Sequence, residues 1–290
     1  MGAIANLFGY LLNFLYNLFN NYGIAIIIFS VILRIILIPV TISQQKSMKK
    51  SAKMQEKMKE IQNKYKNNPE KLNQETIDLY KREKMNPFSG CLSSILQIII
   101  ILSVFWLVSK PLTYMKKVDT EVINGYIEEI KTEDGKASTY PEIQVIQRKA
   151  SEDEKVYINM NFFGLDLSKV PNQNMSDWTV YIIPVLYVIT SFISVKLTSI
   201  KQNKEKPESK EISKDVENKE KQDPSDEALE SMHQMTNSMN YMIPIMSISI
   251  AFIAPLGLAL YWLISNVLMI IERLIIEKVF KDKEEEKENA

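Results

Sequence analysis

The fold is decided by the stretch Gly23-Ile-Ala-Ile-Ile-Ile-Phe-Ser-Val-Ile-Leu-Arg34-Ile-Ile-Leu-Ile-Pro-Val-Thr-Ile42, which holds one charge near its middle. About 20 helical residues cross the ~30 Å hydrocarbon core of a bilayer. Charge-free blocks also occupy residues 1–33, 85–109, 178–195 and 231–271. The last block is long enough for two crossings, with Pro255-Leu256-Gly257 as a turn between them. The sequence therefore predicts an all-α membrane protein with five transmembrane helices.

The overall composition hides this pattern. The 290 residues carry 35 basic and 35 acidic side chains, and 46% are hydrophobic. This composition excludes a disordered chain and a protein held to DNA by bulk charge. One cysteine and one histidine exclude a disulfide framework and a multi-cysteine metal site. We therefore expect no enzyme, no metal and no cofactor.

The charge pattern divides the chain into ten segments. Residues 1–22 carry Asn6, Asn13, Asn17 and Asn20 on one helical face, which predicts an uncharged amphipathic helix in the membrane interface on the extracellular side. A sixth span is the alternative for this segment. The remaining segments are transmembrane helices at 23–42, 87–109, 178–197, 238–254 and 257–276, a cytoplasmic helical hairpin at 43–86, an extracellular loop at 110–177, a disordered cytoplasmic linker at 198–237 and a cytoplasmic tail at 277–290.

The distribution of basic residues predicts the orientation. Segment 41–86 holds twelve Lys and Arg against six acids, whereas 110–177 holds nine against twelve. Basic loops stay in the cytoplasm. We therefore expect a multi-pass protein of the bacterial cytoplasmic membrane, with the N-terminus outside and the C-terminus inside. The lysines of the hairpin would then contact anionic lipid.

Arg34 is the candidate functional residue. A charge at the centre of a span costs about 2.5–3.5 kcal/mol on insertion scales. The charge-free blocks contain no carboxylate to pair with it, so we expect Arg34 to lack an intramembrane counter-ion and to face a water-filled groove. Polar residues of the spans are candidates to line that groove: Ser30, Gln97, Thr190, Ser191, Ser194, Tyr261, Trp262, Ser265 and Asn266.

Three motifs resemble the YidC/Oxa/Alb family of membrane protein insertases. They are Arg34-Ile-Ile-Leu-Ile-Pro39-Val-Thr-Ile-Ser-Gln-Gln-Lys46, Tyr80-Lys-Arg-Glu-Lys-Met-Asn86-Pro87-Phe-Ser-Gly90-Cys91, and Pro255-Leu-Gly257-Leu-Ala-Leu-Tyr261-Trp262-Leu-Ile-Ser-Asn266. The absence of a large periplasmic domain and of a lipoprotein cysteine makes the chain most similar to Gram-positive, clostridial forms of the family.

The resemblance implies a five-helix fold whose polar groove opens to cytoplasm and lipid. It implies that Arg34, Ser30 and Tyr261 or Trp262 contact the substrate. The function implied is insertion and folding of nascent membrane proteins. The ribosome and the Sec translocon are left open as further partners.

Two other functions stay open at this stage. An anion channel or secondary transporter would use Arg34 as its selectivity charge. A structural assembly factor would only shelter the helices of partner proteins. The absence of inverted repeats and of broken half-helices, and a lone charge in place of a ring or relay, disfavour the channel or transporter.

Overall fold

The computed structural model describes residues 2–65, 68–83, 89–136, 138–204 and 249–288. The chain divides into two compact units, each of which is described here by itself. Unit 1 comprises residues 1–35, 101–212 and 241–290, and unit 2 comprises residues 36–100 and 213–240. Helices dominate both units, and the described residues include one short β-hairpin.

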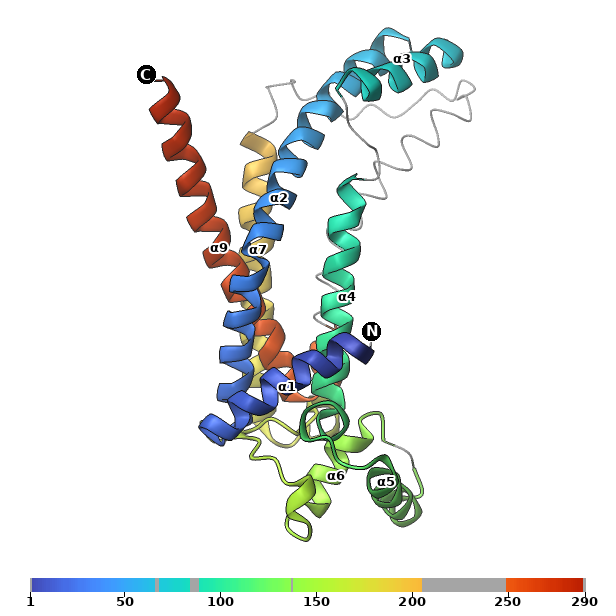
Figure 1. The fold of residues 1–290 in the computed structure, drawn as a ribbon, viewed down its shortest axis with the longest axis vertical. Coiled ribbons are helices and arrows are strands. Elements are labelled where there is room, and N and C mark those ends of the chain that lie inside the picture. Colours follow the sequence, from blue (N-terminus) through green and yellow to red (C-terminus); the bar gives the residue numbers. More distant parts are fainter. Residues whose placement is uncertain (1, 66–67, 84–88, 137, 205–248, 289–290) are drawn as a thin grey trace. The chain divides into compact units, whose positions relative to one another are not determined.

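Helices α2 (Tyr22–Lys64), α4 (Ser89–Ser109), α7 (Ile182–Lys204) and α9 (Leu256–Glu288) are the long apolar elements of the chain (Figure 1). Within unit 1, α7 and α9 pack against each other. Two of these helices contain apolar stretches long enough to cross a membrane, at Tyr22–Ser47 and Leu256–Ile276. Shorter apolar helices lie at Ile98–Ser109 and Trp178–Ser194. Most of the expected span 238–254 lies outside the described residues.

Helix α1 (Gly2–Phe19) turns sharply into α2. Asn20 adopts a left-handed conformation with φ 47°, and only two residues separate the helices. Figure 1 shows α1 running obliquely away from the start of α2. The rings of Phe8 and Phe29 meet edge to face with centroids 5.6 Å apart. By length and composition α1 is also a candidate span. Its crosswise packing is the geometry expected of a helix that lies along a membrane surface.

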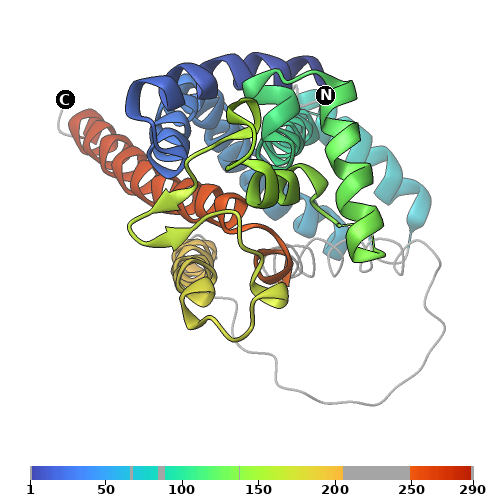
Figure 2. The same cartoon turned by 90° about the horizontal axis from the view of Figure 1, so that it is seen from below.

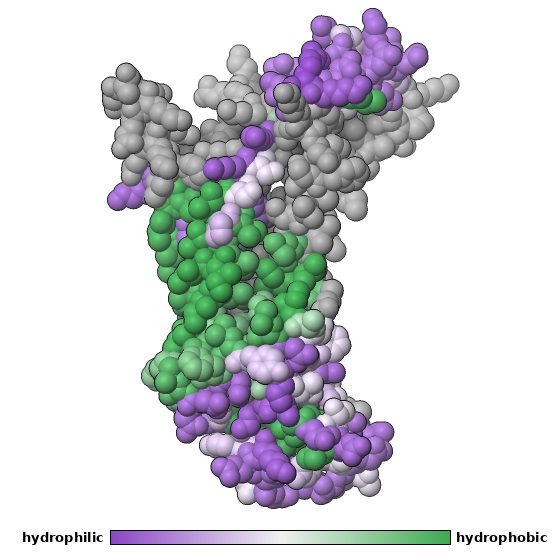
Figure 3. All heavy atoms as spheres, in the orientation of Figure 1, coloured by the Kyte–Doolittle hydropathy of each residue, from purple (hydrophilic) through white to green (hydrophobic). Residues whose placement is uncertain are grey.

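The exposed face of α1 is apolar, whereas its inner face packs on the protein. Leu7 and Phe14 are 66% and 64% exposed, and Leu12 and Leu15 are buried. The longer helices of unit 1 also expose large apolar side chains, which include Trp106, Leu186, Ile189, Phe192, Ile271 and Leu274. Figure 3 shows these helices as a hydrophobic band next to a hydrophilic 110–177 segment. This surface is that of an all-α membrane protein.

The 110–177 segment is folded. It contains the π-helix η1 (Leu112–Lys116), α5 (Thr120–Asp134), α6 (Pro141–Lys149), the short 3-10 helices η2 (Glu154–Val156) and η3 (Pro171–Gln173), and strands β1 (Asn161–Phe162) and β2 (Leu165–Asp166). The strands pair antiparallel, with Phe162 opposite Leu165. A further 3-10 helix, η4 (Trp178–Tyr181), leads into α7. Apolar side chains of α5 and α6, including Ile123, Ile130, Ile143 and Ile146, form the small core of this segment.

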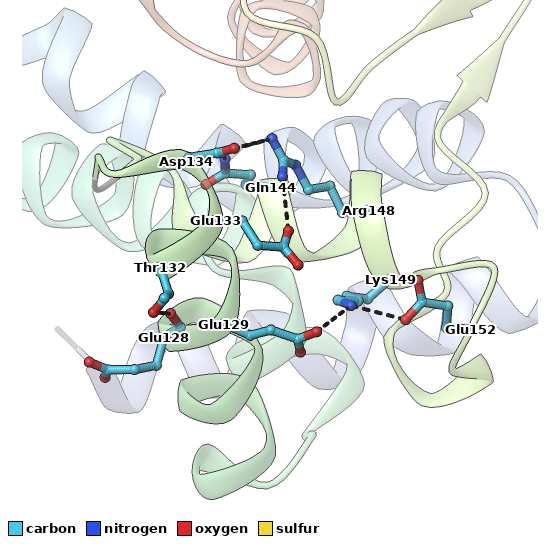
Figure 4. Close-up of polar contacts among 9 residues, drawn as sticks. All are labelled: Glu128, Glu129, Thr132, Glu133, Asp134, Gln144, Arg148, Lys149 and Glu152. Carbon is cyan, nitrogen blue, oxygen red and sulfur yellow. Dashed lines mark hydrogen bonds and ion pairs between the residues drawn. The ribbon is translucent and has the colours of Figure 1, made fainter.

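Charged side chains join α5 to α6 on the outside of that core (Figure 4). Arg148 Nη2 contacts both carboxylate oxygens of Asp134 at 2.7 Å. Lys149 Nζ lies 2.8 Å from Glu129 Oε1 and 3.0 Å from Glu152 Oε2. Such exposed pairs each contribute little, about 0–1 kcal/mol, so the core supplies most of the stability.

Backbone hydrogen bonds attach the 110–177 segment to the first turns of α2 and α9. The Tyr22 amide donates to the Asn159 carbonyl at 3.0 Å. The Leu256 and Gly257 amides donate to the carbonyls of Lys169 and Leu167, both at 2.9 Å. Figure 2 shows the β1–β2 hairpin beside the start of α9. Because the free amides of a helix start need partners, these bonds attach the starts of both α2 and α9 to the 110–177 segment.

Unit 2 contains the second part of α2 and the helix α3 (Pro69–Arg82). Helix α2 continues without a break past Pro39 to Lys64, so no helix boundary occurs at the expected limit of residue 42. Asn68 caps α3 by accepting the Lys71 amide, as its place before Pro69 suggests. Met54 and Leu79 are buried between the two helices, and the Thr76 hydroxyl lies 3.5 Å from Met58 Sδ.

Candidate functional site around Arg34

Arg34 and Glu272 both lie within apolar stretches of their helices. Arg34 lies twelve residues after Tyr22, and Glu272 lies sixteen residues after Leu256. At about 1.5 Å per residue, these positions are about 18 Å and 24 Å along their helices. Both positions fall within the stretches long and apolar enough to cross a membrane, Tyr22–Ser47 and Leu256–Ile276.

Arg34 forms an ion pair with Glu272. The contact joins Arg34 Nε to Glu272 Oε2, and the two side chains are 20% and 8% exposed. The expectation that Arg34 lacks an intramembrane counter-ion was therefore wrong. Glu272 is the first residue after the charge-free block 231–271, and the last span, taken to residue 276, includes it.

The pair explains how two charges are accommodated among apolar helices. An unpaired charge costs about 2.5–3.5 kcal/mol at the centre of a span. Together the two charges are neutral, and attraction between them is stronger in a low-dielectric interior than in water. Removing one member of a buried pair costs about 3–5 kcal/mol, because the other charge stays buried without a partner.

Glu272 extends a polar stripe on α9. Tyr261, Ser265 and Glu272 follow at spacings of four and seven residues, which place them on one helical face. The buried Tyr261 side chain hydrogen-bonds to Ser265 and interacts electrostatically with Arg34. On α2, Ser30 lies one turn before Arg34, and its buried hydroxyl donates to the Ile26 carbonyl at 2.7 Å. The structure thus brings Arg34 and Tyr261 together.

A second polar group lies between α7 and α9. The Asn266 amide donates to Ser191 Oγ at 3.0 Å and to Thr190 Oγ1 at 3.3 Å. The rings of Trp262 and Tyr187 lie 6.2 Å apart. Trp262 and Asn266 are displaced by about 100° around α9 from the stripe of Tyr261 and Glu272, so they face a different neighbour.

Two further candidates are placed less fully. Ser194 is half-buried and lies one turn after Thr190 on α7. Gln97 belongs to α4, and its side chain lies outside the described residues. The structure thus separates the expected residues into an arginine group on α2 and α9 and an asparagine group on α7 and α9.

The sequence matches one family model. The model is described as 60Kd inner membrane protein, and it matches residues 14–284 of the 290 in the chain. The chain belongs to this family. The resemblance to the YidC/Oxa/Alb insertases is thereby confirmed.

Relatives in the 60Kd inner membrane protein family are named membrane protein insertase YidC. The protein of Caldanaerobacter subterraneus subsp. tengcongensis is 27% identical over 281 residues, which cover 97% of each chain. That of Treponema denticola is 25% identical over 272 residues, 94% of this chain and 37% of the relative. The Treponema pallidum protein is 24% identical over 269 residues, and the match spans 34% of it. The chain therefore spans about a third of the Treponema relatives and nearly all of the Caldanaerobacter one.

Membrane protein insertion is the activity that the printed names give to these relatives. Family membership and the apolar helices support a multi-pass protein of a bacterial membrane. Within this family context, the site residue that sequence reasoning missed is Glu272. One signal could have found it, since residue 272 lies eleven positions after Tyr261, or three helical turns, and thus shares its face.

Proposed function

We propose that this chain inserts nascent membrane proteins, often small or single-span, into the bilayer and helps them to fold. In this proposal Arg34 lies in a polar groove that receives the hydrophilic tail of the substrate. The observation that carries it is the Arg34–Glu272 pair, which maintains two charges at depth between helices whose outward faces are apolar. Charged residues inside a membrane are costly and are typical of sites where polar groups must be handled.

The tail would be solvated by side chains instead of bulk water. Ser30, Tyr261, Trp262, Asn266, Thr190, Ser194 and Gln97 are proposed to supply hydroxyl, amide and indole groups along the groove. Arg34 attracts acidic residues of the tail, and this attraction is stronger in a low-dielectric site than in water. The apolar segment of the substrate then moves into lipid, because its apolar surface is removed from water. No nucleotide or covalent intermediate is part of the proposal.

The orientation follows from charge. The basic hairpin at 43–86 lies in the cytoplasm, α1 lies in the outer interface, and the 110–177 segment lies outside. The C-terminal tail is then cytoplasmic. This arrangement rests on the positive-inside bias of the loops. The ribosome and the Sec translocon are the proposed protein partners in the delivery of the substrate. The lysines of the hairpin contact anionic lipid.

Arg34 can be tested with substrates that differ only in tail charge. Arg34→Ala and Arg34→Lys are compared with the wild type in proteoliposomes, with a single-span substrate that carries either no acid or three acids in its N-terminal tail. We expect Arg34→Ala to lower insertion of the acidic-tailed substrate about tenfold, as the loss of roughly 1.4 kcal/mol of charge interaction would. Arg34→Lys should retain much of the activity.

Lys196→Ala is the matched control, since it removes an exposed basic residue at the edge of the span on α7. It should leave insertion unchanged. Equal insertion of both substrates by Arg34→Ala and the wild type would refute the role of charge attraction.

An anion channel that uses Arg34 as its selectivity charge is the alternative function. Anion flux into proteoliposomes that depends on Arg34 would favour the channel instead.

A further inference from the structure

We propose that Glu272 is a resident competitor for Arg34, which acidic residues of a substrate tail must displace. Glu272 would thereby set how strongly insertion depends on the charge of the substrate. The inference rests on the proposed function and names a residue that determines specificity at the same site. It starts from the ion pair between Arg34 Nε and Glu272 Oε2.

The carboxylate of Glu272 is held differently from that of Glu142, which is also buried in unit 1. Glu142 accepts hydrogen bonds from the Thr113 amide at 3.0 Å and from the Thr113 hydroxyl at 2.6 Å. Among the described residues, neither oxygen of Glu272 accepts a hydrogen bond, although both are buried. Buried carboxylates that serve structure are normally hydrogen-bonded. Glu272 is therefore held by charge, and a second carboxylate can replace it.

Arg34 offers room for that second carboxylate. The pair engages the Nε atom, and the side chain of Arg34 is more exposed than that of Glu272, at 20% against 8%. A guanidinium carries five N–H donors in a planar fork, and its two terminal nitrogens form a separate edge that binds carboxylates in a bidentate manner. An incoming acid can thus bind Arg34 before Glu272 leaves.

The displaced carboxylate has a short path to water. Glu272 lies four residues before Ile276, where the apolar stretch of α9 ends. This is about one helical turn, or about 6 Å, so the carboxylate lies close to the end of the apolar stretch. When the tail departs, Glu272 can return to Arg34, so the competitor also favours release of the substrate.

Removal of the competing charge should sharpen the preference for acidic tails. Glu272→Gln conserves the size of the side chain and leaves Arg34 without its counter-ion. Insertion is measured by protease protection in proteoliposomes for substrates with no acid or three acids in the tail, and the readout is the ratio of the two. We expect the ratio to rise about threefold or more, because an uncompensated charge in a low-dielectric site attracts more strongly.

Two variants separate competition from a structural role. Glu128→Gln is the matched control, since it removes an exposed acid on α5, and it should leave the ratio unchanged. In the double variant Arg34→Ala, Glu272→Gln, the ratio should fall below that of Glu272→Gln alone, because no guanidinium remains to attract the acidic tail. A ratio for Glu272→Gln equal to the wild type, or a rise that persists in the double variant, would overturn the proposal.

Folding and general activity are read independently. Should Glu272→Gln fail to give a monodisperse protein, Glu272→Asp serves in its place. It keeps the charge but shortens its reach, so the ratio should rise in the same direction; an unchanged ratio there overturns the proposal. Insertion of the neutral-tailed substrate above empty liposomes reports the insertase function itself, so its loss in the wild type would refute that function without reference to Glu272.

Discussion

Gly9 decides how closely α1 approaches the segment that follows α4. A Cβ atom at this position would lie 1.8 Å from the Tyr114 carbonyl oxygen and 2.6 Å from its carbon. Both are backbone atoms and cannot move aside as a side-chain end would. Gly125, in the interior of α5, is the opposite case, because an added Cβ meets no atom within 4 Å.

The two glycines should respond to alanine with opposite signs. Gly9→Ala should lower the free energy of unfolding by about 1–3 kcal/mol through overpacking. Gly125→Ala should raise it by about 0.5–1 kcal/mol, since alanine loses less entropy in a helix. Thermal unfolding in detergent measures both. A Gly9→Ala protein as stable as the wild type would show that α1 does not pack this closely.

The two members of the ion pair differ in how readily the sequence alone identifies them. Arg34 could be singled out from the sequence, because a charge amid apolar residues is conspicuous. Glu272 was not, because it stands at the end of an apolar block and is followed by charged residues. Its significance depends on a contact between α2 and α9, which no local pattern encodes.

At the scale of elements, local signals predicted some helix limits well and others poorly. Asn68 and Pro69 start α3 where their chemistry suggests. Helix α2 passes the expected limit at 42 and α9 passes that at 276, because a charged helical sequence continues an apolar helix without any stop signal. The fold of 110–177 was not predictable, since it depends on distant partners such as Tyr22 and Gly257.

The contacts of Asp177 in the turn before α7 should make the stability of the fold depend on pH in the acid range. Asp177 caps η4 by accepting from the Thr179 amide and hydroxyl, and its carboxylate lies 2.7 Å from Lys169 Nζ. The hydrogen bonds from Lys169 and Thr179 lower the pKa of Asp177 to about 2. Because this pKa is below the ordinary value of 3.8, the carboxylate stabilises the fold above pH ~4 and loses that effect as pH falls towards about 2.

In Asp177→Asn, the midpoint of thermal unfolding should therefore change less between pH 5 and pH 2 than it does in the wild type. Unfolding in detergent across that pH range measures this. Lys169→Gln removes the cationic partner of Asp177, so it should also reduce the change of the unfolding midpoint over the same pH interval. Identical slopes for the wild type and both variants would show that this contact does not contribute.

At the scale of the whole molecule, the apolar outer faces of the helices and the charge of the loops predict a defined orientation. Two exposed positions test it in a Cys91→Ala background: Gly125→Cys on α5 and Asn73→Cys on α3. A membrane-impermeant maleimide should label the Gly125→Cys protein in intact cells. It should label the Asn73→Cys protein only after lysis, and the reverse pattern would show the opposite orientation.

The Arg34–Glu272 pair also has a consequence for the synthesis of this chain. More than 200 residues separate the two partners. At about 5–20 residues per second, the arginine waits on the order of ten to fifty seconds in the membrane before the glutamate is made. During that time the nascent chain carries an unmatched charge of the kind that disfavours insertion. The first span of a newly made copy therefore carries its arginine without a counter-ion until the last span has been made.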